Sequence, residues 1–150
     1  MNFIQSGRGL MCALLLATGL SAAPPEMTVY KTKTCGCCGK WVDHMRTNGF
    51  NVTVKEVPST APYRQQFGVP EALLSCHTAV VAGYSIEGHV PAADIQRLLK
   101  QHPKGKGLAV PGMPMGSPGM EGASKDAYTV LLFDDKGGTT DFKKYAGDPQ

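Results

Sequence analysis

Three thiols within four residues, Cys35-Gly36-Cys37-Cys38, are the side chains of this 150-residue chain best suited to chemistry. Residues 27–32 before them alternate apolar and polar side chains, as in a half-buried strand. Residues 39–48 after them carry a helical apolar stripe. The thiols therefore fall at a strand-to-helix junction, where free N–H groups and the positive end of the helix dipole lower a cysteine pKa. A thiolate there serves as a nucleophile in disulfide exchange or as a ligand for soft metals.

The third cysteine favours metal binding over simple redox chemistry. Cys35 and Cys38 form a C-x-x-C pair, which is typical both of thiol–disulfide oxidoreductases and of metal sites. An extra thiol at Cys37 offers an oxidoreductase wrong disulfide partners, whereas closely spaced thiolates can bridge several soft ions. Three interpretations remain open: a soft-metal site, a disulfide oxidoreductase using Cys35 and Cys38, and a domain held by structural disulfides.

Further metal donors lie elsewhere in the chain. Cys76 and His77 come just before a short apolar run, residues 78–82, which is typical of a buried strand. His89 follows a turn and is expected at the same end of the sheet. His44 is expected on a solvated helix face, and His102 at the end of a helix, next to the negative end of its dipole.

The donor types favour copper. Two cysteines of the motif together with Cys76 and His77 could form a closed zinc site. Met113 and Met115, with Met120, add thioether sulfur, which copper accepts and zinc rarely uses. Methionine also fills irregular gaps in a core, so packing is the alternative role for these side chains. We expect Cu(I), with several ions bridged by the thiolates.

The remaining chain predicts an α/β fold. Segments after the first helix are expected as a strand over 51–57, a helix over 59–67, a helical turn over 69–75, strands over 78–82 and 83–88, and a helix over 91–101. Residues 107–120 are rich in Gly, Pro and Met and are expected to hold no regular structure. Residues 128–133 and 139–145 are expected to form a terminal β-hairpin. The order β-α-β-α-β-β-α resembles the thioredoxin fold, which implies that Cys76 and His77 face the cysteine motif.

The N-terminus predicts export. Arg8, the apolar stretch 10–20 and the small residues 21–23 are typical of a secretory signal peptide over residues 1–23, with an uncleaved membrane anchor as the alternative. The mature chain, 24–150, is expected to be a single thioredoxin-like metal-binding domain with a core over 27–102, a loop over 103–124 and a hairpin over 125–146. We expect it in the periplasm, without stable membrane insertion after signal removal. Structural disulfides are common in such a compartment.

Composition excludes several classes of function. Hydrophobic residues make up 42% of the chain, which allows one core, and the formal charge of +3 comes without a Lys/Arg block. The chain therefore lacks the basic footprint of a nucleic-acid-binding protein. Its glycines match neither the Walker nor the dinucleotide-binding pattern.

Taken together, the motifs resemble a known family. The matching segments are Cys35–His44, Ser75–Ala79, Glu87–Pro91 and Gly107–Glu121. They are similar to those of the CopG-type periplasmic copper-resistance proteins, a family long described as a domain of unknown function. The resemblance implies a thioredoxin-like domain in which Cys35, Cys37, Cys38 and Cys76 hold copper as a multinuclear cluster. It also implies copper-efflux or copper-chaperone partners and a role in cycling Cu(I) and Cu(II). His77, His89, Met113 and Met115 match by motif context.

Overall fold

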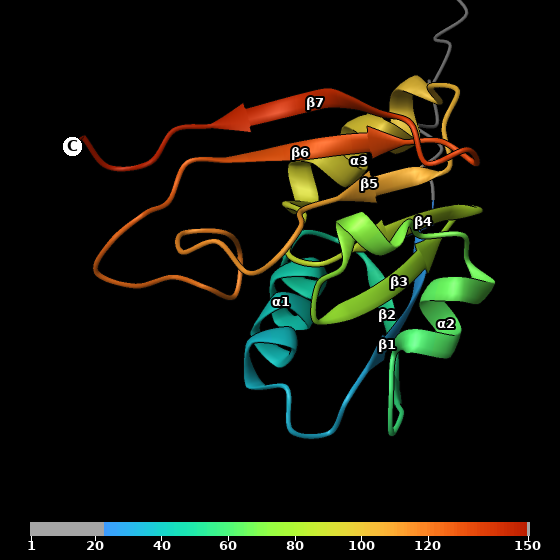
Figure 1. The fold of residues 1–150 in the computed structure, drawn as a ribbon. Coiled ribbons are helices and arrows are strands. Elements are labelled where there is room, and N and C mark those ends of the chain that lie inside the picture. Colours follow the sequence, from blue (N-terminus) through green and yellow to red (C-terminus); the bar gives the residue numbers. More distant parts are fainter. Residues whose placement is uncertain (1–22, 150) are drawn as a thin grey trace, which may run out of the picture.

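The computed structural model describes residues 23–149, so the predicted signal peptide, apart from Ala23, lies outside the described residues. These residues form one seven-stranded mixed sheet with helices packed against it (Figure 1). The strand order is β2-β1-β3-β4-β5-β6-β7. In chain order the elements are β1 (Glu26–Lys31), α1 (Gly36–Thr47), β2 (Asn51–Glu56), α2 (Ala61–Gln66), the 3-10 turn η1 (Glu71–Leu73), β3 (His77–Val81), β4 (Tyr84–Glu87), α3 (Ala92–Gln101), β5 (Gly107–Ala109), β6 (Tyr128–Phe133) and β7 (Thr139–Tyr145).

The mixed α/β prediction is confirmed, including the order β-α-β-α-β-β-α up to residue 101. Strand β1 runs parallel to β2 and antiparallel to β3, and β3 is antiparallel to β4. Helix α1 begins at Gly36, which confirms the prediction that the cysteines lie at the N-terminus of the first helix. Cys35 is therefore its N-cap, and Cys37 and Cys38 lie in its first turn.

The prediction that residues 107–120 hold no regular structure is wrong for the first three of them. Gly107–Ala109 form β5, which pairs in parallel with β4 and antiparallel with β6. A side chain at Gly107 would collide with the backbone of Ser85, so only glycine allows this close pairing. A three-residue strand is too short to show a period of two. Through β5, the predicted C-terminal hairpin of β6 and β7 becomes part of the same sheet.

Hydrophobic residues pack on both faces of the sheet. Leu108 joins the large cluster that includes Trp41 and Met45 of α1 and Ile95 of α3. The next residue, Ala109, joins a smaller cluster around η1, because successive side chains of a strand point to opposite faces. Helices α1 and α3 thus share one face, and η1 covers the other. Among residues 23–149, no helix is long and apolar enough to span a bilayer.

The expected solvated position of His44 is wrong. Its ring is half-buried, and Nε2 accepts a hydrogen bond of 3.2 Å from the Ala92 N–H, in the first turn of α3. That turn lacks a side-chain cap from its own N-cap residue, Pro91. His44 supplies an acceptor instead, and so links α1 to α3. His102 ends α3, as predicted, in a left-handed conformation.

Candidate metal centre

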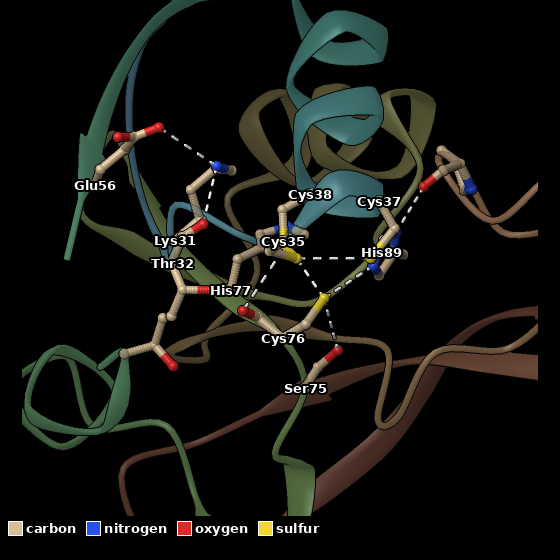
Figure 2. The surroundings of a disulfide bond; sticks show 12 residues. Lys31, Thr32, Cys35, Cys37, Cys38, Glu56, Ser75, Cys76, His77 and His89 are labelled. Atoms are coloured by element: carbon tan, nitrogen blue, oxygen red, sulfur yellow. Dashed lines mark hydrogen bonds and ion pairs between the residues drawn. A yellow bond between two sulfur atoms is a disulfide. The ribbon is translucent and has the colours of Figure 1, made fainter. Parts of the chain in front are cut away.

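The cysteine motif occupies the N-terminus of α1 (Figure 2). A turn closed by the Cys35 N–H and the Thr32 carbonyl leads from β1 into the helix. Cys35 and Cys38 form a disulfide with their Cα atoms 5.4 Å apart. The sulfur of Cys37 lies 3.6 Å from that of Cys35, and Cys37 is a free thiol. Cys38 is buried, whereas Cys35 and Cys37 are half-buried.

The sheet brings Cys76 to the same place. His77, the first residue of β3, pairs with Lys31, the last residue of β1. Cys76 therefore lies beside the turn that leads into α1, and its carbonyl oxygen is 3.7 Å from the Cys38 sulfur. The sulfur atoms of all four cysteines lie within 4.8 Å of one another. The structure thus groups Cys76 with the three thiols of the motif.

Two histidines extend this cluster. The sulfur of Cys76 is 2.9 Å from His89 Nε2 and 3.5 Å from His77 Nδ1. His89 Nδ1 donates to the carbonyl of Pro118 at 2.7 Å, which leaves the Nε2 lone pair directed at Cys76. Such a backbone bond is how proteins fix the tautomer of a metal-ligating histidine. His77 is fully buried, and its Nε2 has no hydrogen-bond partner among the described residues.

The local electrostatics favour neutral side chains. Burial, helped by nearby Cys37, raises the pKa of the Cys76 thiol to about 12. Burial lowers the pKa of His77 to about 3 and also lowers the pKa of His89. The Cys76 S–H therefore donates to His89 Nε2. A metal binding here has to displace the Cys76 proton.

The Gly/Pro/Met-rich loop contacts the site through its backbone. Besides the Pro118 carbonyl on His89, Gly119 packs against the first turn of α1 with φ +88°. A Cβ at Gly119 would lie 2.7 Å from the Cys37 carbonyl and 3.3 Å from His89 Nδ1. The Gly119 N–H also donates a hydrogen bond to the Glu121 carboxylate, which lowers the pKa of Glu121. Sequence reasoning missed this role, although a glycine after a proline is a turn signal.

The methionines predicted as ligands take separate positions. Met113 is 51% exposed. Met115 lines a small cavity together with Tyr128 and Tyr145 of the terminal hairpin. Of the eight predicted site residues, the structure groups the four cysteines and two histidines through Cys76. Ligation by any of the eight stays a prediction.

The fold and the site define a class: an α/β protein with one mixed sheet, whose first helix begins at a cluster of thiols and imidazoles that could hold a metal ion. The family model described as a protein of unknown function, DUF411, matches residues 73–120, which include Cys76, His77 and His89. Two solved structures of a copper resistance protein, copG, are 42% identical to this chain. Form 1 has a TM-score of 0.78 and covers 83% of this chain and 99% of its own. Form 2 has a TM-score of 0.77 and covers 81% and 98%. No curated protein matches. The chain belongs to the CopG-type copper-resistance family.

Proposed function

We propose that this protein is an exported copper-binding protein of copper resistance, which holds Cu(I) through Cys35, Cys37, Cys38 and Cys76. One observation carries the proposal. Two chain segments, with Cys38 and Cys76 separated by 38 residues, bring four sulfur atoms within 4.8 Å of one another. Clustered thiolates suit Cu(I), Zn and Fe–S clusters and can bridge more than one ion, and the copper resistance of the relatives favours Cu(I) among these. A multinuclear cluster is therefore part of the proposal.

The two histidines could bind the same copper ions. His89 presents a lone pair fixed by its bond to Pro118, and Nε2 of buried His77 has no hydrogen-bond partner within residues 23–149. Imidazole accommodates Cu(II) as well as Cu(I), so bound copper would supply one-electron redox chemistry. The Cys35–Cys38 disulfide has to be reduced first by an external dithiol, which gives up two electrons and two protons, becomes a disulfide itself and leaves Cys35 and Cys38 as thiols. Met113 and Met115 remain candidate outer ligands in this proposal.

The copper resistance of the relatives supports the cellular side of the proposal. We place the mature protein in the periplasm, as a single domain over residues 24–150. We expect it to exchange copper with efflux or chaperone proteins. Its first four strands, ordered β2-β1-β3-β4 with only β1 and β2 parallel, support a thioredoxin-like core.

The test is an anaerobic Cu(I) titration of the reduced mature protein, against a colorimetric Cu(I) chelator, beside a Cys76→Ser variant. We expect more than one tightly bound Cu(I) per chain, and fewer in the variant. One ion, unaffected by the variant, would confine the site to the motif and remove Cys76 from it. No tight binding would refute the copper proposal.

The disulfide favours a second candidate function, thiol–disulfide exchange. Cys35 and Cys38 are paired at a helix N-terminus, and Cys35 is half-buried while Cys38 is buried. An external thiolate would therefore reach the Cys35 sulfur and release Cys38 as the leaving thiolate. Insulin reduction that persists with a copper chelator, is lost in Cys35→Ser and survives in Cys37→Ser would support this candidate. Inactivity of the chelated wild type would exclude it.

A further inference from the structure

A buried ion pair lies beside the Cys76 segment. Glu87 of β4 is fully buried, and its Oε1 accepts hydrogen bonds from Arg64 Nε at 3.1 Å and from the Ser75 N–H at 2.8 Å. Its Oε2 accepts from the Thr78 hydroxyl at 2.6 Å. Arg64, on α2, is also buried, and it donates to the Ser75 carbonyl at 3.3 Å.

These bonds hold the chain on both sides of the donor residues. Both backbone polar groups of Ser75 are bound to the ion pair, and Thr78 is bound to its carboxylate. Cys76 and His77 are the two residues in between. The Ser75 hydroxyl in turn donates to the Gly112 carbonyl, which ties the same segment to the Gly/Pro/Met-rich loop. The segment that carries two of the donors is thus fixed at its ends.

Stability alone does not account for this arrangement. Removing two charges from water is expensive, and well-packed apolar residues of similar volume often stabilise a fold as much as a buried ion pair. Two backbone groups of one residue and a hydroxyl two residues past Cys76 all converge on a single pair. That convergence fixes the direction in which the Cys76 side chain leaves the backbone, which apolar packing does less sharply.

We propose that Arg64 and Glu87 are positioning residues for the metal centre, because they hold Cys76 and His77 in place opposite the cysteine motif of α1. That the bound metal is copper rests on the proposed function, whereas the positioning of Cys76 does not depend on it. Removing a residue that orients a metal ligand typically lowers the metal affinity by about 10- to 100-fold.

The test compares Glu87→Gln with a matched control, Asp94→Asn. Asp94 is also buried and ion-paired, to Arg97 at 3.3 Å, but its pair anchors the C-terminal hairpin instead of the Cys76 segment. Two readouts are measured on the reduced full mature chain. One is Cu(I) affinity by competition with a chelator. The other is the rate at which iodoacetamide alkylates Cys76 relative to Cys37 in the metal-free protein, followed by peptide mass spectrometry.

We expect Glu87→Gln to weaken Cu(I) binding by about 10- to 100-fold and to raise the relative alkylation rate of Cys76 several-fold. Asp94→Asn should lower the denaturation midpoint and leave both readouts unchanged. Arg64→Lys keeps the charge but loses the fork that joins Glu87 to the Ser75 carbonyl. It should change both readouts in the same direction by smaller factors, and it serves as the test if Glu87→Gln does not fold.

Unchanged alkylation and unchanged Cu(I) affinity in a folded Glu87→Gln or Arg64→Lys variant would overturn the inference. Equal changes in Asp94→Asn would overturn it as well, since they would trace the effect to general destabilisation. Failure of the copper function is separate, because it shows as absent Cu(I) binding in the wild type. The alkylation of Cys76 would still decide the positioning role.

Discussion

The metal-free protein should lose stability in mild acid because of His77. The ring is fully buried, with Nδ1 3.5 Å from the Cys76 sulfur and its centroid 4.3 Å from that of Trp41. Its other nitrogen has no partner among residues 23–149. A proton added to this ring brings a charge into surroundings that cannot solvate it. Burial therefore lowers the pKa of His77 from 6.5 to about 3.

The sign and size of the effect follow from that pKa. A lowered pKa means that the folded state binds protons less readily than the unfolded state, in which the pKa is 6.5. The contribution of His77 to folding is fully present above pH 6.5 and is lost as the pH falls towards 3. Between pH 7.5 and pH 5 it should decrease by about 2 kcal/mol.

The assay is urea denaturation of the reduced, metal-free protein at pH 7.5, 6 and 5, beside His77→Gln. Burial also lowers the pKa of His89 and of His44, so the wild type should lose more than the His77 share alone. The difference between wild type and His77→Gln isolates that share. His102→Asn, at an exposed position that already has left-handed backbone, is the control. If His77→Gln loses as much stability in acid as the wild type, the reasoning is refuted.

Three further substitutions test the contacts of the Gly/Pro/Met-rich loop and of the C-terminal hairpin. Gly119→Ala should lower the free energy of unfolding by about 2–3 kcal/mol in urea denaturation, because it adds a clash with the Cys37 carbonyl to an unfavourable φ of +88°. Gly112→Ala, with φ +69° and open space around it, should lower it by only about 1 kcal/mol. Tyr145→Phe should lower the thermal midpoint, with a loss of about 1–2 kcal/mol, since the tyrosine hydroxyl donates to Asp94 at 2.6 Å.

The contrary outcomes are equally specific. Equal losses in Gly119→Ala and Gly112→Ala would show that the loop does not press on the helix, and that only the backbone conformation matters. An unchanged midpoint in Tyr145→Phe would mean that the hairpin is held by Arg97, which donates to the Phe142 carbonyl at 2.8 Å and stacks on its ring.

Local patterns in the sequence predicted the part of the site that is local. The cysteine motif had to lie at a strand-to-helix junction, because the alternation before it and the apolar stripe after it are both contained within about twenty residues. The prediction that Cys76 lies near the cysteine motif came only from the resemblance to a known fold. The pairing of β1 with β3, which brings Cys76 there, cannot be inferred from the spacing of residues.

Other features had no sequence signal at all. Arg64 and Glu87 are 23 residues apart on different elements. From sequence alone, an isolated charged residue is expected on the surface, so their burial could not be predicted. His44 shares its helix face with polar Lys40 and Thr47, yet its Nε2 accepts a hydrogen bond from the Ala92 N–H in the first turn of α3. The loop was predicted to contribute methionine sulfur atoms to the site. In the structure it contacts His89 through a carbonyl group and α1 through a glycine.

The uneven spacing of the four thiols also bears on how copper and folding interact. Cys35, Cys37 and Cys38 are neighbours in any conformation, while Cys76 joins them only after β1 and β3 pair. An unfolded chain therefore already offers Cu(I) a three-thiol chelate, and folding adds Cys76 and the imidazoles. A ligand that also binds the unfolded state stabilises the fold less than one that binds only the folded state. The gain in the free energy of unfolding from copper should therefore depend on the ratio of its affinities for the folded and the unfolded chain. Under the proposed copper function, a chain that meets Cu(I) before it folds can then fold around the ion without first releasing it.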